Sequence, residues 1–279
     1  MLAVHGKRSD GFHELTSLVA ALKFGDTLVV RIADTAGDSL QCSNPAVPLG
    51  AENLILKAAA EFRARLKEDV YFEFDLKKRI PMGAGFGGGS GNAVAALNGM
   101  NQLTKAPLSR KALCEIAAGL GSDCPFFLEA RPSRMRGRGE SIEPLEGALA
   151  RRLQGMPVIL IKPEFEVDTT WAYRRLAAGA PESYQKEAID TAYLEESISA
   201  GKMESFLSNS FEKPVGEKYL AIPTLLEQLR ASGVSCLMSG SGSGCFVLPG
   251  FSSLAPEQIK AMVQDAWGES VFWVETSIH

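Results

Sequence analysis

A run of glycines at residues 83–89 is the strongest chemical signal in this 279-residue sequence. Five of these seven residues are glycine, and they lie within PMGAGFGGGSGNAVAALNG, between an expected strand and an expected alanine-rich helix. Glycine lets backbone N–H groups approach a ligand without a Cβ in the way. The N-terminus of a helix adds further donors and the positive end of its dipole, so the pattern favours a phosphate site. A flexible linker is the alternative, although linkers rarely join a strand directly to a helix.

The spacing of these glycines does not fit the common nucleotide-binding classes. Gly83, Gly85 and Gly88 match GxGxxG, but a dinucleotide fold also needs a strand about 20 residues further on that ends in an acidic residue. The sequence predicts a second helix there instead. The P-loop pattern GxxxxGK[ST] and the HRD and DFG motifs of protein kinases are absent. The loop therefore indicates a phosphate site of another class.

Periodicity predicts the elements on either side of the loop. Residues 70–76 (VYFEFDL) alternate apolar and polar side chains, as a half-buried strand requires. Ser109 is a plausible N-cap and Gly121 a plausible C-cap for a helix between them. The segment GSDCPFFL, residues 121–128, is expected to be a loop that runs into an apolar strand. The other elements expected in this half are a strand at 27–32 and helices at 53–66 and 93–100.

The pattern restarts near residue 150. Strands are expected at 156–163, on both sides of SGSGSG (residues 239–244) and at 270–276, with helices from 169 and at 184–207, 218–231 and 255–267. This order is typical of a split β-α-β arrangement. We therefore predict an α+β protein of two domains, residues 1–148 and 149–279.

Composition narrows the class of protein. The formal net charge of −4 argues against a general nucleic-acid binder, and no apolar run is long enough for a membrane span. The N-terminal residues do not resemble a secretory signal. The five cysteines contain no CxxC pair, which fits reduced thiols better than disulfides or a zinc site. A cytoplasmic protein is expected.

Several segments together resemble the GHMP kinases. The loop from Pro81 to Ala93 resembles the second motif of that superfamily, and four other stretches agree in order: GKRSDGFHEL, GSDCPFF, VDTTWAY and SGSGSG followed by Cys245 and Phe246. NSFE, residues 209–212, is a weaker match. The triple glycine followed by Ser90 is similar to the branch that phosphorylates the 2-hydroxyl of 4-diphosphocytidyl-2-C-methyl-D-erythritol in the non-mevalonate isoprenoid route. The resemblance covers nearly the whole chain.

The resemblance implies a two-domain GHMP kinase fold, with an N-terminal domain like domain 2 of ribosomal protein S5 and a ferredoxin-like C-terminal domain. It implies ATP and Mg²⁺ as cofactors and Asp123 as the base that accepts the proton of the attacking hydroxyl. By spacing alone, a turn cap is the favoured interpretation of Asp123, and only the resemblance reverses this. Ser90, which could help to hold Mg²⁺, could be a plain N-cap. The implied ATP-binding residues are Pro81, Met82, Gly83, Ala84, Gly85, Phe86, Gly87, Gly88, Gly89, Ser90 and Gly91.

The implied acceptor side lies in three segments. A histidine next to an aromatic residue can hydrogen-bond a base edge while the ring packs on it, and Phe12 with His13 matches the cytidine-binding stretch. The alternative for His13 is a strand histidine that is satisfied internally. Thr169 matches a threonine on the acceptor side, but helix capping explains it equally well. The third motif contributes Gly240, Ser241 and Gly242, or is only a flexible hairpin loop.

Two positions and one whole motif depart from the family pattern. Gly91 stands where a second serine is usual, and Phe12 stands where tyrosine is more frequent. The first motif, a short strand whose lysine supports the transferring phosphate, is absent, and Lys7 is in the wrong place to replace it. Either the start at Met1 is internal to a longer chain, which we favour, or this is a shortened relative that binds ligands and turns over poorly.

The expected function is thus phosphorylation of a small molecule, without nucleic-acid or membrane partners, by a monomer or weak homodimer. The alternatives are a GHMP kinase of the homoserine or mevalonate type, which would not depend on cytidine, and a non-catalytic nucleotide-binding protein.

Overall fold

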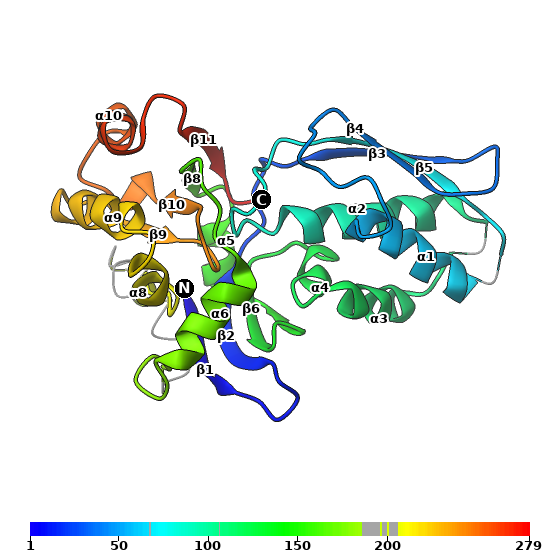
Figure 1. Cartoon of the computed structure of the whole chain (residues 1–279), viewed down its shortest axis with the longest axis horizontal. Helices are drawn as coiled ribbons and strands as arrows, with labels where there is room; N and C mark the ends of the chain where they lie inside the picture. Colours follow the sequence, from blue (N-terminus) through cyan, green and yellow to red (C-terminus); the bar gives the residue numbers. More distant parts are fainter. Residues whose placement is uncertain (67, 106, 186–195, 197–199, 201–205) are drawn as a thin grey trace. The chain divides into compact units, whose positions relative to one another are not determined.

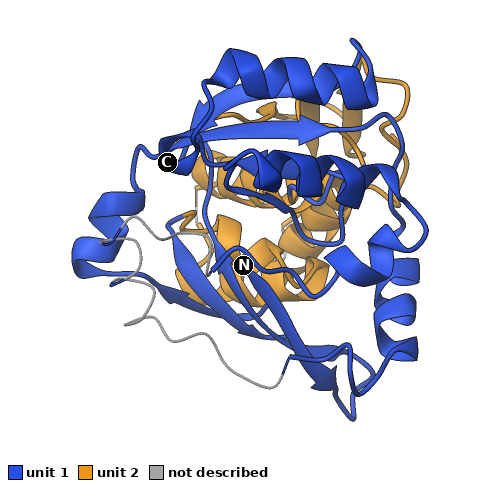
Figure 2. Ribbon diagram, turned by 90° about the vertical axis from the view of Figure 1, so that its left-hand side faces the viewer, with its two compact units in different colours: residues 1–23, 83–86, 131–279 blue, residues 24–82, 87–130 orange. Residues whose placement is uncertain are grey.

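The computed structural model describes residues 1–66, 68–105, 107–185, 196, 200 and 206–279. The chain forms two compact units, each with its own hydrophobic core (Figure 2). The first unit comprises residues 1–23, 83–86 and 131–279, and the second comprises residues 24–82 and 87–130. Residues 83–86 of the glycine loop therefore belong to the first unit, and the residues that follow belong to the second.

The second unit is a three-stranded sheet with its helices on one side (Figure 1). The central strand β5 (Phe72–Lys77) pairs antiparallel with β3 (Thr27–Ile32) and parallel with β4 (Ser39–Cys42). The alternation in β5 buries Phe72, Phe74 and Leu76, as the sequence predicts. The helices of this unit are α1 (Leu54–Leu66), α2 (Gly88–Leu103), α3 (Arg110–Leu120) and α4 (Cys124–Phe127).

Helix α2 begins directly after the glycine loop and is fixed by a buried apolar face. Four residues of this face are fully buried at helical spacing: Ala93, Ala96, Leu97 and Met100. Gly99 lets β3 approach closely, since a Cβ there would lie 2.8 Å from Cγ2 of Val30. Burial of this face holds the first turn of α2, and hence its free backbone N–H groups, in one orientation.

The first unit contains two antiparallel four-stranded sheets. One has the order β1-β2-β6-β7, with β1 at Leu2–Lys7, β2 at His13–Val19, β6 at Ser133–Gly137 and β7 at Ser141–Pro144. The other has the order β11-β8-β10-β9, with β8 at Pro157–Lys162, β9 at Cys236–Met238, β10 at Cys245–Val247 and β11 at Phe272–Ser277. Numbered along the chain, the second sheet has the strand order 4-1-3-2, which is that of a ferredoxin-like split β-α-β arrangement.

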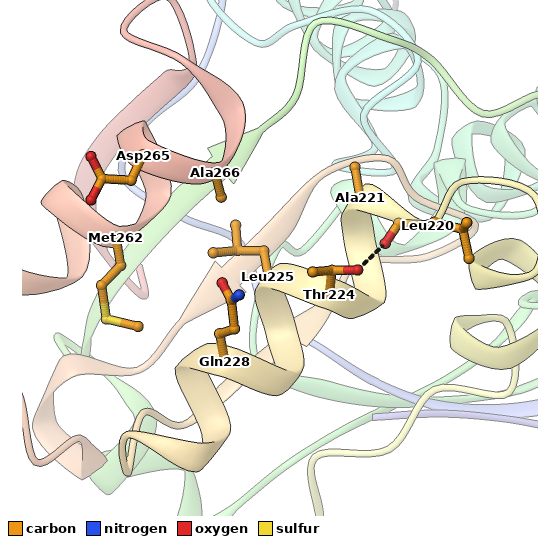
Figure 3. Close-up of a pocket in the computed structure, with 8 residues that line it drawn as sticks. All are labelled: Leu220, Ala221, Thr224, Leu225, Gln228, Met262, Asp265 and Ala266. Atoms are coloured by element: carbon orange, nitrogen blue, oxygen red, sulfur yellow. Dashed lines mark hydrogen bonds between the residues drawn. The ribbon is translucent and has the colours of Figure 1, made fainter.

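The helices of the first unit are α5 (Gly147–Leu153), α6 (Thr169–Ala178), α8 (Glu212–Gly216), α9 (Ala221–Ala231), the short 3₁₀ helix η2 (Pro249–Phe251) and α10 (Pro256–Trp267). A pocket of about 430 Å³ lies between α9 and α10 (Figure 3). It is lined by Leu220, Ala221, Thr224, Leu225, Gln228, Met262, Asp265 and Ala266. None of these eight side chains is basic and Asp265 is acidic, so the pocket does not suit a nucleotide phosphate.

One sequence-based expectation about the fold is wrong. The apolar run 124–127 is helix α4, not part of a strand. A short apolar run does not by itself separate strand from buried helix. Pro125 decides the outcome here, because proline fits the first turn of a helix, where its missing N–H has no partner to lose. Cys124 and Phe126 are the buried residues of this turn.

The remaining expectations fare as follows. The α+β class and the predicted strands and helices flanking the glycine loop and the SGSGSG turn are confirmed, with ends that shift by a few residues. Most of the helix expected at 184–207 lies outside the described residues. The two compact units are defined by contacts within the structure and do not test a domain boundary along the sequence. The boundary between residues 148 and 149 therefore stays a prediction. Within the described ranges, no helix is long and apolar enough to span a membrane.

Candidate active site

The first part of the glycine loop is bound through its carbonyl groups to the turn at residues 239–244. The amides of Ser243 and Gly244 donate to the carbonyls of Gly83 (3.3 Å) and Ala84 (3.0 Å), and Ser239 Oγ donates to the carbonyl of Gly85 (2.9 Å). Glycine is required at this contact. A Cβ on residue 85 would overlap the carbonyl oxygen of Ser239, and one on residue 244 would lie 2.5 Å from that of Ala84. The SGSGSG segment is therefore a fixed partner of the loop, not a flexible hairpin.

The amides of the loop remain available. No backbone N–H of residues 83–90 donates a hydrogen bond to any residue that the structure describes. Gly83, Gly85 and Gly87 have φ values of 56°, 69° and 69°, a region that glycine enters without steric cost. Gly87 is the N-cap of α2 and supplies no side-chain acceptor, so the first turn of α2 keeps its unpaired donors and its positive dipole end. The segment can bind an anion through several amides at once.

Ser90 is the third residue of α2, so the alternative that it serves as the N-cap is wrong. Burial raises the pKa of the Cys124 thiol, and the nearby Ser90 side chain opposes this shift. At Gly91, a Cβ would meet the Phe127 ring at 3.4 Å, an ordinary contact. Packing therefore does not require glycine at position 91, and the departure from the family pattern there removes only a possible hydroxyl.

A buried carboxylate anchors the loop in the second unit. Asp26 Oδ2 pairs with Lys78 Nζ at 2.5 Å and accepts from Asn92 Nδ2 at 3.0 Å, while Oδ1 accepts from the amides of Arg79 (2.6 Å) and Ile80 (2.8 Å). Burial alone would raise the pKa of Asp26, but the hydrogen bonds from Lys78 and the two amides outweigh it and lower the pKa. Asp26 thus ties the residues before the loop to the first turns of α2.

Asp123 has no such partners. It precedes α4, yet its side chain makes no capping hydrogen bond, so the interpretation of Asp123 as a turn cap is wrong. The residue remains exposed to solvent, but protein atoms crowd its carboxyl group, and this desolvation raises the pKa of Asp123. A carboxylate with a raised pKa and no hydrogen bond from a described residue is free to accept a proton.

The turn at 239–244 brings two predicted acceptor-side residues together. Thr169 Oγ1 and Ser241 Oγ lie 2.9 Å apart. Thr169 does not cap α6, because the N-cap is Asp168, whose carboxylate accepts from the amide of Trp171 at 2.6 Å. Asn209 fixes the start of the same turn by donating to the carbonyl of Gly240 at 2.8 Å.

His13 lies among aromatic rings at the start of β2. Its ring is centred 5.0 Å from that of Tyr173 and 6.1 Å from that of Tyr184. Its Nε2 is buried and has no hydrogen-bond partner among the described residues, so the alternative of an internally satisfied histidine is wrong. Burial and the nearby Lys7 lower the pKa of His13, so its ring is neutral at pH 7. A neutral ring with an unpartnered nitrogen is suited to bind a polar edge of a ligand.

The structure does not bring Phe12 into this aromatic group. The Phe12 ring is 47% exposed, and the guanidinium of Arg138 lies over it, 4.9 Å from its centroid. The Phe12 amide donates to Asp10 at 3.1 Å. Phe12 and His13 are neighbours in sequence, but the ring that packs against His13 is Tyr173.

Comparisons with known proteins agree with this geometry. The sequence matches the N-terminal domain of the GHMP kinases over residues 53–130 and their C-terminal domain over residues 190–269. It is 35% identical over 255 residues to the 4-diphosphocytidyl-2-C-methyl-D-erythritol kinase of Nitratidesulfovibrio vulgaris strain Hildenborough, covering 88% of this chain and 85% of that protein. It is 38% identical to the kinase of the same name from Thermotoga maritima, covering 88% and 87%. The chain belongs to the 4-diphosphocytidyl-2-C-methyl-D-erythritol kinase family of the GHMP kinases.

Solved structures confirm the two-domain GHMP kinase fold predicted for this kinase family member. A crystal structure of 4-(cytidine 5'-diphospho)-2C-methyl-D-erythritol kinase superposes with a TM-score of 0.79 at 32% identity, covering 100% of this chain and 96% of that one. Mevalonate kinase from Methanococcus jannaschii superposes with a TM-score of 0.63 at 12% identity, covering 100% and 96%, and at that identity shows the fold alone.

The sequence analysis missed three contributors to the site of this GHMP kinase. Tyr173 lies within VDTTWAY, which resembles the family, but no role was expected for it. The pair of Asp26 and Lys78 could not be anticipated, because 52 residues separate its members and neither belongs to a recognised motif. Arg138 lies in a stretch that showed no pattern. The roles of the predicted residues themselves stay predictions.

Replacing Asp26 with asparagine is expected to lower the free energy of unfolding by about 3 kcal/mol at pH 7, because it leaves the buried Lys78 ammonium without its counter-charge. The lowered pKa of Asp26 means that its contribution is full above the ordinary aspartate value of about 4 and is lost as the pH falls through the folded-state value. Urea unfolding should therefore show a constant difference from wild type between pH 7 and about pH 5, and a smaller one below about pH 4.

The matched control is Asp75→Asn, which changes an exposed carboxylate on β5 of the same unit. It should shift the unfolding free energy by less than about 0.5 kcal/mol. Equal effects of the two substitutions would contradict the anchoring role of Asp26.

Proposed function

We propose that this chain transfers the γ-phosphate of ATP to the 2-hydroxyl of 4-diphosphocytidyl-2-C-methyl-D-erythritol, in the non-mevalonate isoprenoid route. The hydroxyl oxygen forms the new bond to the γ-phosphorus, the bond from that phosphorus to the β,γ-bridging oxygen breaks, and ADP leaves. The hydroxyl proton passes to a carboxylate. Family membership supports the kinase chemistry. The observation that favours a cytidine-bearing acceptor is the buried Nε2 of His13, which has no hydrogen-bond partner among the described residues.

ATP is proposed to bind along residues 81–91. The support is the set of unpaired amides of residues 83–90, which offer donors to phosphate oxygens without a side chain in the way. Among the described residues, no group of three or more His, Cys, Asp or Glu side chains is placed to hold a metal ion. Mg²⁺ would therefore be held mainly by phosphate oxygens and water, with Ser90 as a protein ligand, and would neutralise charge on the β- and γ-phosphates.

Asp123 is proposed as the general base. Two properties support this role: no described residue satisfies its carboxylate, and desolvation raises its pKa, which makes it a better proton acceptor at neutral pH than an ordinary aspartate. Asp26 and Asp168, by contrast, have carboxylates committed to backbone amides.

The acceptor is proposed to place its cytosine against Tyr173 and its polar edge against His13 Nε2. Thr169, Ser241 and the neighbouring Gly240 and Gly242 would contact the acceptor from the adjoining turn, and Phe12 would border the base. Homoserine and mevalonate have no base for His13 to bind. We also propose a cytoplasmic location, supported by five cysteines that are all unpaired, and a monomer or weak homodimer as the oligomeric state.

The direct test measures ADP formation by the purified chain with 4-diphosphocytidyl-2-C-methyl-D-erythritol, mevalonate and homoserine in parallel. Turnover with the cytidine-bearing acceptor alone supports the proposal. Turnover with mevalonate or homoserine would overturn the acceptor assignment. ATP binding without turnover on any acceptor would indicate a non-catalytic nucleotide-binding protein.

Asp123→Asn should lower kcat by about 10²- to 10⁴-fold, because it removes the proton acceptor while preserving shape. Its thermal stability should not fall, since the substitution removes a desolvated charge that has no hydrogen bond to lose. The acid limb of the wild-type kcat profile should lie above the ordinary aspartate pKa of about 4, because protonation of Asp123 abolishes its function. A kcat within threefold of wild type would show that Asp123 is not the base.

His13→Phe should raise the KM for the cytidine-bearing acceptor about 3- to 10-fold, because it removes one hydrogen bond and keeps a ring beside Tyr173. The KM for ATP should stay within twofold. His279→Phe, at an exposed position, serves as the control. Equal acceptor KM values for His13→Phe and the wild type would rule out a contact between His13 and the base.

A further inference from the structure

Lys162 is a buried cation at the end of β8, and its surroundings are unusual. The residue is 5% exposed, and no ion pair of its ammonium is found among the described residues. Nζ instead donates to the backbone carbonyls of Pro163 and Phe165, both at 3.0 Å. Burial lowers the pKa of Lys162, and the carboxylate of Glu166 opposes this shift. Burying a cation raises the free energy of the folded state unless the cation is hydrogen-bonded. The hydrogen bonds of Lys162 go to the turn at 163–166 and hold it in place.

The turn that Lys162 holds touches the glycine loop by two routes. The carbonyl of Phe165 also accepts from Ser243 Oγ at 2.6 Å, and the amide of Ser243 donates to the carbonyl of Gly83. Ser243 is completely buried. The second route is direct: a Cβ at residue 83 would lie 2.6 Å from Cδ of Glu166. Both routes lie within the first compact unit.

We propose that Lys162 is a positioning residue for nucleotide binding. It fixes the carbonyl of Phe165, through which Ser243 is oriented to hold Gly83, and thereby sets the direction of the free amides that follow in the loop. Its ammonium does not contact the nucleotide, because it is buried and engaged by two carbonyls. Lys162 is therefore not a substitute for a phosphate-binding lysine.

This role rests on the proposed function only in taking ATP as the ligand of the loop. It can be tested by equilibrium binding, which does not require turnover. The probe is a non-hydrolysable ATP analogue with Mg²⁺, titrated by calorimetry into the full chain and its variants. Binding of 4-diphosphocytidyl-2-C-methyl-D-erythritol is measured in parallel.

Lys162→Met keeps an unbranched apolar side chain, shorter only by the terminal group, and removes the hydrogen-bond donors. It should weaken binding of the analogue about 10-fold or more and weaken acceptor binding by a clearly smaller factor. A general loss of folded protein would instead reduce the number of sites for both ligands equally. Lys213→Met, which removes an exposed lysine in the same unit, should bind both ligands like wild type. A folded Lys162→Met variant that binds the analogue as tightly as wild type would overturn the proposal.

Ser243→Ala keeps the proposal testable if Lys162→Met does not fold. Removing the hydroxyl breaks the same path at its second step, so analogue binding should weaken about 3- to 10-fold. In the double variant the loss should be smaller than the product of the single losses, because both residues act through the Phe165 carbonyl. The proposal that both residues act through the Phe165 carbonyl would be overturned if Ser243→Ala bound the analogue like wild type. It would also be overturned if the affinity loss of the double variant equalled the product of the two single losses. Normal analogue binding by wild type without turnover would contradict the proposed function and leave this test intact.

Discussion

Three hydrogen bonds between backbone segments about 160 residues apart determine how the glycine loop is presented. The carbonyls of residues 83–85 accept hydrogen bonds from Ser243, Gly244 and Ser239. The amides of the same residues have no partner among the described residues. An unpaired buried or half-buried amide is costly in a folded protein unless water or a ligand satisfies it. Glycine at positions 85 and 244 permits the close approach, which any Cβ would block. The proposed phosphate binding is therefore supported by the hydrogen bonds that engage the loop's carbonyls as well as by its glycine content.

Four polar side chains separate into two kinds. Asp26 and Lys162 have their hydrogen bonds completed by backbone groups, and both hold segments that lead into or touch the loop. Asp123 and the Nε2 of His13 are left without partners among the described residues. A folded protein tolerates few buried polar atoms without partners, so the Nε2 of His13 is a candidate for ligand contact. The proposal of Asp123 as the base rests instead on the desolvation that raises the pKa of its carboxyl group and on the absence of a hydrogen bond from a described residue.

The sequence predicted those helices and strands that depend on a pattern of neighbouring residues. The alternation of β5, the alanine face of α2 and the Ser109 cap of α3 each depend on neighbouring residues and were predictable. Helix α4 was not, because a four-residue apolar run carries no periodicity. Short strands such as β4 and β7 were also missed, since pairing with distant segments stabilises them.

The site was predictable only as separate motifs. Resemblance placed Asp123, His13 and the glycine loop, but it could not show that His13 packs on Tyr173 while Phe12 lies under Arg138. The same limit applies to Lys162, whose significance comes from a carbonyl that Ser243 also binds, 78 residues beyond Phe165. Contacts of this range depend on the finished fold.

Hydrogen–deuterium exchange on the loop would test most directly whether its free amides bind the nucleotide. The experiment compares peptides covering residues 83–90 with and without a non-hydrolysable ATP analogue and Mg²⁺. These amides have no partner among the described residues, so we predict fast exchange in the free protein and strong protection on binding. Slow exchange without ligand, or no added protection at saturating analogue, would contradict the assignment of the glycine loop as the phosphate site.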